Sequence, residues 1–189
     1  SSAINKPTNS DVYSIEMAEF VSTMGRVAQP EYLPYAFYIE GGGVAVENAL
    51  KTAFDWKVRK NLEKNIKNKG SQIIHFKECF HGRTGYTLSL TDSPDPRKTL
   101  FFPKFDWPRI DNPKIDFPLT DESLTALIEK EKFAIQQIKS ALAANENDIA
   151  ALIIEPIQGE GGDNHFREEF LSQLKTLSLE EEFLLIFDE

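Results

Sequence analysis

Three consecutive glycines, Gly41, Gly42 and Gly43, stand between a short apolar run and a helix-periodic segment. A glycine turn at that place leaves backbone N–H groups unobstructed at a helix N-terminus, where the helix dipole favours an anion such as phosphate. Neither common nucleotide motif fits: Val46 stands where the dinucleotide fingerprint needs its third glycine, and the G-K-[ST] of a P-loop is missing. The glycines indicate an anion site, with a ligand-free tight turn as the alternative.

Three acidic residues also follow apolar runs. Asp188 closes the run 183–187, so its carboxylate lies beside low-dielectric surface and needs a partner, for which a protonated ring nitrogen would serve. Glu155 and Glu160 lie in EPIQGEGG, where Pro156 and three glycines turn the backbone away from the preceding run. The alternatives are a capping or turn role for Asp188 and plain solvation of the two glutamates.

Other site chemistries have little support. His75, His81 and His165 have no partner at metal-ligand spacing, and neither H-E-x-x-H nor G-x-S-x-G occurs. Cys79 is the single cysteine, so the chain forms no internal disulfide, and we interpret this residue as a small core or loop residue. Zinc and serine-hydrolase chemistry are therefore disfavoured.

The hydrophobic periodicity predicts alternating helices and strands. Helices are expected at residues 11–26 (after Ser10 or Asp11 as N-cap), over about 18 residues from Val44, at 121–145 and at 166–177. Buried strands are expected at residues 35–39, 72–76, 149–154 and 183–187. Residues 79–119 are rich in Gly, Pro and Asp, which predicts a long functional loop with one brief strand at Phe101 and Phe102.

Continuous apolar strands separated by helices predict an α/β fold with three layers (αβα) and a mostly parallel sheet. Ligands of such sheets bind outside the carboxyl ends of the strands. Four groups of candidate residues follow the expected strands: Glu40 with the glycines, residues 79–82, Glu155, and Asp188 with Glu189. Because the last strand would still need a covering helix, we expect residues 1–189 to be part of a larger domain.

The charge favours a small-molecule partner. With 21 Lys+Arg against 30 Asp+Glu, the formal net charge is −9, which repels nucleic-acid backbones and anionic membranes. No apolar run approaches the roughly 20 residues of a spanning helix, and no secretory signal is visible. We expect no nucleic-acid or membrane partner and a cytoplasmic location.

Four sequence motifs follow one another along the chain: GGGVAVENALKTAFDWK, FHGRTGYTLSLT, EPIQGEGG and LLIFDE. Together they resemble the large, cofactor-binding domain of the class III pyridoxal-phosphate (PLP) aminotransferases of fold type I. The resemblance covers essentially the whole chain but only the central part of a family member. It implies PLP as the cofactor and a homodimer with sites at the subunit boundary. NKPTNSDVYS, FHGRTGYTLSLT and FPKFDWPRI are most similar to the branch that transfers the terminal amino group of L-lysine to 2-oxoglutarate.

The resemblance assigns cofactor roles to six residues: Gly42, Gly43, Phe80, His81, Glu155 and Asp188. The glycines would hold the phosphate, in agreement with the anion argument. Phe80, in an aromatic-His-Gly motif, would stack on the pyridine ring, and Asp188 would pair with the pyridinium nitrogen and keep the ring an electron sink. Glu155 would lie beside the cofactor.

The resemblance also implies two substrate-binding residues. Arg83 presents a planar fork suited to a substrate carboxylate, with an ordinary surface arginine as the alternative. Glu160 matches the family glutamate that pairs with a substrate-binding arginine and swings aside for the second substrate.

Some features depart from the family. Many members have Ser-Gly-Thr or Ser-Gly-Ser at the phosphate loop, so the three glycines here would bind through backbone amides alone. The Schiff-base lysine of the family lies beyond Asp188, and Lys77, Lys104 and Lys114 match no family lysine, so residues 1–189 alone are expected to be inactive. Two alternatives stay open: another ω-amino acid aminotransferase, of the 4-aminobutyrate or ornithine type, or a non-catalytic PLP-binding, phosphate-binding or assembly module.

Overall fold

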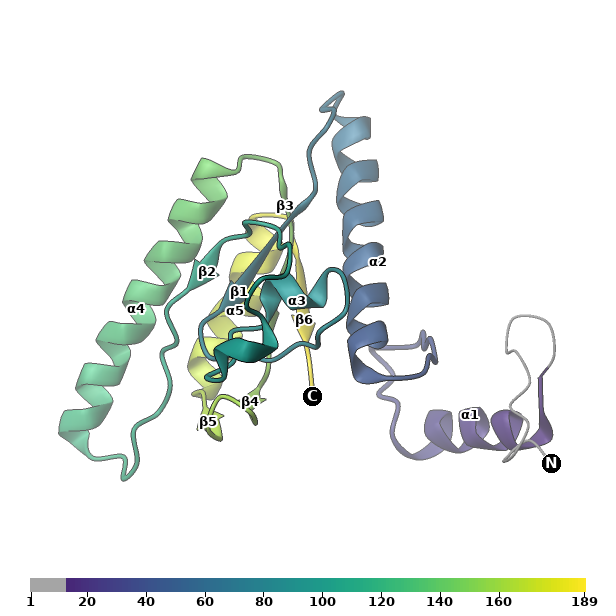
Figure 1. Ribbon diagram of the computed structural model, residues 1–189, viewed down its shortest axis with the longest axis horizontal. Helices are drawn as coiled ribbons and strands as arrows, with labels where there is room; N and C mark the ends of the chain where they lie inside the picture. The colour runs from purple at the N-terminus through teal and green to yellow at the C-terminus, as the bar shows by residue number, and fades with distance from the viewer. Residues whose placement is uncertain (1–12) are drawn as a thin grey trace. The chain divides into compact units, whose positions relative to one another are not determined.

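The computed structural model describes residues 13–189, which belong to two compact units, Ser1–Tyr38 and Ile39–Glu189 (Figure 1). In the first unit, α1 (Ile15–Val27) confirms the first expected helix. Its N-cap is Ser14, whose hydroxyl oxygen accepts a hydrogen bond from the Met17 N–H at 3.1 Å. The caps expected from the sequence, Ser10 and Asp11, lie outside the described residues.

The expected buried strand at residues 35–39 is wrong. These residues have no regular secondary structure, and the side chains of Tyr35 and Phe37 are 94% and 73% exposed. Aromatic and β-branched residues favour strands because they pack against neighbours on a pleated surface. None of the described strands pairs with this segment, so its residues lack the neighbouring strand that would stabilise an extended conformation.

The second unit contains four parallel strands in the order β2–β1–β3–β6, which confirms the mostly parallel sheet. Their bounds are β1 (Gln72–Phe76), β2 (Arg109–Ile110), β3 (Ile149–Ile154) and β6 (Leu184–Phe187). The short strand expected at Phe101 and Phe102 is wrong, because these residues form an exposed turn. The additional strand of the long loop is β2, which pairs with the end of β1.

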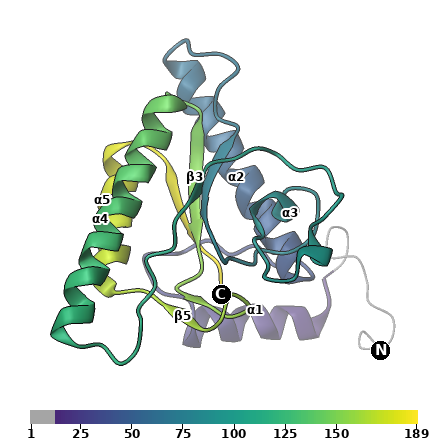
Figure 2. The same ribbon diagram turned by 60° about the vertical axis from the view of Figure 1, so that its left-hand side comes forward.

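Helices cover both faces of this sheet, as the three-layer prediction requires (Figures 1 and 2). One face carries α2 (Gly42–Glu63), and the other carries α4 (Asp121–Ala144) and α5 (Glu168–Glu180). Successive side chains of β3 serve the two cores: Leu152 and Ile154 pack with α4 and α5, whereas Ile153 packs with α2. The continuous apolar run of β3 therefore contributes side chains to the hydrophobic cores on both faces of the sheet.

Besides β2, four other short elements were not predicted from the sequence. They are α3 (Thr87–Leu90), the 3₁₀ helix η1 (Pro96–Lys98), and the antiparallel strands β4 (Ile157–Gln158) and β5 (Asn164–His165). The strands β4 and β5 form a hairpin that includes most of the EPIQGEGG stretch. Within the described residues, no helix is long and apolar enough to cross a membrane.

The expected full burial of the last strand is also wrong. The side chains of β6 are half-buried, and Phe187 is 48% exposed. The reason is position: β6 is one of the two edge strands of the described sheet and pairs only with β3. Its apolar composition nevertheless identified it correctly as a strand.

The turn before β6 is held by the C-terminal part of α2. Lys60 and Lys64 both form ion pairs with Glu182, and the Lys57 ammonium donates to the Glu182 carbonyl oxygen at 2.7 Å. Hydrogen bonds from Lys64 and Lys60 lower the pKa of Glu182 to about 2. Because β6 leads directly to Asp188, these contacts help to hold the strand that positions this candidate site residue.

We expect Glu182→Gln to make the protein easier to unfold at pH 7. The carboxylate has a lowered pKa in the folded state, so its stabilisation is present above pH 4.5, its ordinary pKa, and is lost as the pH falls towards 2. Urea midpoints should therefore differ at pH 7 and converge between pH 4.5 and 2, with a smaller difference in high salt. Glu181→Gln is the matched control. A difference that does not change with pH would contradict this account.

Candidate functional site

The carboxyl ends of three parallel strands and the N-terminus of α2 surround a cavity of about 310 Å³. Its lining includes every residue that the sequence assigned to a cofactor, and four further residues: Gly42, Gly43, Phe80, His81, Glu155 and Asp188, with Gly82, Ile157, Gly159 and Glu189. These residues come from four separate parts of the chain. Crossover connections of a parallel sheet bring them to the same edge.

The glycine end of the cavity is open to an anion. Gly41 is the N-cap of α2 and has φ = 84°, no side chain caps the helix, and no acidic residue lies in its first turn. A Cβ atom on Gly42 would meet no atom within 4 Å, so the backbone of this residue borders free space. First-turn N–H groups at such an end bind phosphate without help from a side-chain hydroxyl.

Two backbones meet closely beside this helix end. Gly82 has φ = 112°, and a Cβ atom on it would lie 2.9 Å from the Gly43 Cα atom. A Cβ on Gly43 would lie 3.4 Å from the Thr84 Cγ2 atom. The loop after β1 is therefore packed directly against the helix N-terminus. Glycine suits position 82 because it can adopt this positive φ and because the close contact leaves no room for a Cβ atom.

Buried His81 and partly buried Asp188 form a pair at another side of the cavity. The Asp188 Oδ2 atom lies 2.7 Å from the His81 Nδ1 atom, and His81 is 2% exposed. Burial lowers the pKa of His81, but hydrogen bonds with Asp188 and Cys79 outweigh it and raise the pKa to about 9. At neutral pH the imidazole is therefore protonated and donates to Asp188.

The His81–Asp188 pair predicts an alkaline loss of stability. A raised folded-state pKa gives stabilisation that is complete below pH 6.5, the ordinary value, and is lost as the pH rises through 9. We expect urea midpoints of the protein to fall over this range, and His81→Gln to remove most of that slope. His165→Gln is the control variant. An equal slope in the protein and in His81→Gln would rule out this pair as the cause.

Glu155 connects two of the loops that line the cavity. Its Oε1 atom accepts a hydrogen bond from the Phe80 N–H at 2.7 Å. Burial raises the pKa of this carboxyl group, and the hydrogen bond from Phe80 acts in the opposite direction. The segment after β3 thereby holds the backbone of the aromatic residue after β1.

Glu160 and Arg83 do not line the 310 Å³ cavity. Glu160 accepts a hydrogen bond from the Ser93 hydroxyl at 2.8 Å and forms an ion pair with Lys98. Partial burial raises the pKa of Glu160, but Lys98 and Ser93 outweigh it and lower the pKa. Sequence reasoning did not identify Lys98 as part of this region.

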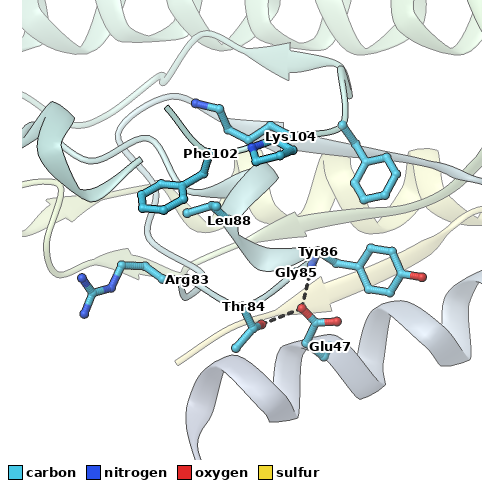
Figure 3. Close-up of a pocket in the computed structure, with 10 residues that line it drawn as sticks. Glu47, Arg83, Thr84, Gly85, Tyr86, Leu88, Phe102 and Lys104 are labelled. Carbon is cyan, nitrogen blue, oxygen red and sulfur yellow. Dashed lines mark hydrogen bonds between the residues drawn. The ribbon is translucent and has the colours of Figure 1, made fainter. Parts of the chain in front are cut away.

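Arg83 instead lines a neighbouring cavity of about 610 Å³, together with Lys104 and several aromatic residues (Figure 3). Figure 3 shows Glu47 of α2 below the loop that carries Arg83. The Glu47 carboxylate accepts from the Thr84 hydroxyl at 2.5 Å and from the Tyr86 N–H at 2.7 Å. Glu47 thus fixes the loop between the two cavities, while the Arg83 side chain is exposed.

The remaining candidates have structural surroundings. Cys79 is buried, and its Sγ atom lies 3.0 Å from the Leu90 carbonyl oxygen, in agreement with the core interpretation. No group of three or more His, Cys, Asp or Glu residues suited to a metal ion occurs in residues 13–189. Two of the four further lining residues, Gly82 and Glu189, belong to groups expected after strands, although no role was assigned to them. Ile157 and Gly159 were missed, and their place in EPIQGEGG beside Glu155 and Glu160 was the available signal.

The family model of the class-III aminotransferases matches residues 8–189. An L-lysine-epsilon aminotransferase of Mycobacterium tuberculosis is 52% identical over 188 residues, which cover 99% of this chain and 41% of that protein. The enzyme of the same name from Amycolatopsis lactamdurans is 47% identical over the same shares. A 4-aminobutyrate aminotransferase of Emericella nidulans is 32% identical over 205 residues, covering all of this chain and 41% of that protein.

A solved structure of lysine aminotransferase from M. tuberculosis superimposes with a TM-score of 0.91 and 51% identity, over 98% of this chain and 42% of that one. The chain thus spans about 41% of the length of the curated relatives named above. The match to the family model extends over the whole described structure, including every residue that lines the 310 Å³ cavity. The chain belongs to the class-III aminotransferase family.

Proposed function

We propose that residues 1–189 are the PLP-binding part of the large domain of an L-lysine ε-aminotransferase, which transfers the terminal amino group of lysine to 2-oxoglutarate. The observation that carries this proposal is the cavity in which a helix N-terminus, an aromatic residue and a partly buried aspartate meet. Relatives named as lysine aminotransferases are 45–52% identical to the chain, against 32–38% for those named as 4-aminobutyrate aminotransferases. This difference favours lysine as the donor.

The residues present fit the cofactor. The cavity of about 310 Å³ lies at the lower end of the size range of small-molecule sites. Free space beside Gly42 and the uncapped start of α2 suit a phosphate group, and Asp188 lies on the same cavity as an acceptor for a protonated ring nitrogen. When bound, PLP supplies an electron sink for the carbon that exchanges its amino group.

Asp188 would hold a proton at the ring nitrogen. Its Oδ2 atom is occupied by His81, and no hydrogen bond to Oδ1 is found within the described residues. A protonated His81 donates to this carboxylate and fixes its orientation, as a positioning residue. An ionised acceptor favours the protonated form of the ring nitrogen.

Phe80 and Glu155 would orient the ring. The Phe80 ring borders the cavity, and its backbone N–H is held by Glu155. Aromatic rings favour offset stacking on another ring, so Phe80 would cover one face of the pyridine and exclude water from it. Burial raises the pKa of the Glu155 carboxyl group, and the hydrogen bond from the Phe80 N–H opposes that shift.

Substrate binding would involve Arg83 and Glu160 at the margin of this cavity, in a homodimer whose sites lie near the subunit boundary. Arg83 is exposed in the larger neighbouring cavity, where a carboxylate of the amino donor or of 2-oxoglutarate could reach it. Glu160 carries a negative charge, since its pKa is lowered.

The test uses the complete polypeptide of which this chain is proposed to be a part. The purified enzyme is supplied with PLP and 2-oxoglutarate, and glutamate formation is measured with L-lysine, L-ornithine or 4-aminobutyrate as the donor. We expect lysine to give the highest kcat/KM. A higher value for ornithine or 4-aminobutyrate would replace lysine as the substrate. Binding of PLP with no turnover of any amine would instead favour a non-catalytic binding module.

A further inference from the structure

One carboxylate oxygen of α2 holds three hydrogen-bond donors of the loop after β1. The Glu47 Oε1 atom accepts from the Thr84 hydroxyl at 2.5 Å and from the Tyr86 N–H at 2.7 Å, as Figure 3 shows. It also accepts from the Thr87 N–H at 3.3 Å. The two N–H groups lie at the start of α3, where the side chain of the N-cap residue, Tyr86, makes no capping hydrogen bond. Glu47 therefore satisfies, from a different helix, donors that α3 leaves unpaired.

The helix α2 contacts this loop at two places that lie one helical turn apart. At its start, the Gly43 Cα atom would lie 2.9 Å from a Cβ atom on Gly82. Glu47 follows Gly43 by four residues, about one turn, and holds Thr84. Arg83 lies between the two held residues of the loop. The rigid helix thus sets the place of the Arg83 backbone relative to the helix end that is proposed to hold the phosphate.

The Arg83 side chain has no anchor of its own. It is exposed in the 610 Å³ cavity, and its guanidinium group has no hydrogen-bond partner among residues 13–189. A long side chain loses rotamer freedom when it binds a ligand, and a mobile loop would add its own ordering to that loss. Because the guanidinium group is not held, the fixed backbone limits the space in which it must find a carboxylate.

We infer that Glu47 is a positioning residue for substrate recognition, which holds Arg83 in register with the phosphate-binding end of α2. This inference rests on the proposed function and deepens it, because it assigns the carboxylate-binding arginine a partner in the helix that begins the cofactor site. Glu47 acts on Arg83 in the ground state and in the transition state alike. Its loss should therefore raise the KM for the substrate and leave kcat nearly unchanged.

The first experiment measures calorimetric binding of glutarate, a dicarboxylate with no keto group to react, to the complete PLP-loaded enzyme. Glu47→Ala should raise the Kd for glutarate about tenfold, because the loop must then become ordered during binding. PLP affinity should stay near the parental value, since Gly82 still packs against Gly43. The matched control is Glu63→Ala, which removes an exposed glutamate at the other end of α2 and should keep the parental Kd.

A double-mutant cycle tests whether Glu47 acts through Arg83. The kcat/KM for 2-oxoglutarate is measured in the parent, in Glu47→Ala, in Arg83→Gln and in the double variant. Glu47→Ala should lower kcat/KM about tenfold when Arg83 is present and have little effect once residue 83 is Gln. An equal loss in both backgrounds would mean that Glu47 has a general structural role, and would overturn the inference.

An unchanged glutarate Kd in Glu47→Ala, an equal rise in Glu63→Ala, or a parent enzyme that does not bind glutarate would also overturn it. If Glu47→Ala does not fold, Thr84→Val decides, because it keeps the shape of the side chain and removes one of the three donors. Its glutarate Kd should rise, and a parental value would contradict the inference. Failure of the proposed function has a different signature: the parent enzyme would form no glutamate from lysine and 2-oxoglutarate, whereas the glutarate comparison would still report on Glu47.

Discussion

Replacing Asp188 with Asn in the complete enzyme is expected to lower kcat for the lysine reaction by about 10²- to 10³-fold, the loss typical when one preorganised electrostatic contact to the reacting group is removed. Asn keeps the shape of the side chain but loses the charge that favours a protonated ring nitrogen. It also removes the charged partner of His81, whose pKa should then fall from about 9. Steady-state kinetics and the absorption spectrum of bound PLP measure the two effects.

Asp163→Asn is the matched control for this variant, because Asp163 is an exposed acid whose φ of 52° suits Asn equally well. It should retain parental kcat and spectrum. If Asp188→Asn kept more than half of the parental kcat, Asp188 would not act on the cofactor, and the electronic role assigned to it would have to be abandoned.

The second large effect is expected from Gly82→Ala. A methyl group there would lie 2.9 Å from both the Gly43 Cα and the Thr87 Oγ1 atoms, at a φ of 112° that L-residues rarely adopt. Backbone strain and overpacking together should cost about 2 to 5 kcal/mol of unfolding free energy. Since the clash pushes the loop away from the start of α2, PLP affinity should fall as well. Urea unfolding and a PLP titration measure the two losses.

Gly85→Ala, three residues further along the same loop, is the control for this substitution. Its added Cβ would lie 3.9 Å from the Glu47 Oε1 atom, an ordinary contact. It should keep nearly all stability and PLP affinity. Similar losses in both variants would mean that the loop tolerates no side chain at all, and the close approach at Gly43 would not be the cause.

The sheet and its covering helices follow from the sequence because their signals are strong and local. In β3, six consecutive apolar residues are fully buried, and alternate side chains serve two cores, so a continuous run was the correct signature. The helix α4 carries a clear apolar stripe and a capping box at Thr120. In such elements the hydrophobic pattern of the local sequence is sufficient to predict both the secondary structure and the buried face.

The secondary-structure predictions were wrong where contacts with other segments of the chain, and not the local sequence, determine the structure. Residues 35–39 have strand composition but no pairing partner among the described strands, and Phe101 and Phe102 form an exposed turn. Conversely, the two residues of β2 have no strand pattern, yet they pair with His75 and Phe76 because the long loop returns along β1. Propensity over so few residues is weaker than tertiary context.

The same distinction applies to the candidate site. Four of the six residues proposed to bind the cofactor, Phe80, His81, Glu155 and Asp188, follow strands, and the parallel topology gathers such positions at one edge. Gly42 and Gly43 instead begin a helix after a segment that is not a strand, and the glycine motif alone indicated them. The pairing of Lys98 with Glu160 was not predictable, because it joins a 3₁₀ turn to a hairpin 62 residues away. The hydrogen bond between His81 and Asp188 joins residues 107 apart, and neither residue's local pattern encodes the other.

A crystal structure of the complete enzyme with PLP tests the central claim most directly, because it shows which of the two neighbouring cavities holds the phosphate. The account predicts phosphate oxygens within hydrogen-bond distance of the Gly42 and Gly43 N–H groups, with the ring nitrogen facing Asp188 and Phe80 against the ring. A phosphate bound instead beside Arg83 and Lys104 in the 610 Å³ cavity, with Asp188 out of contact with the ring, would contradict it.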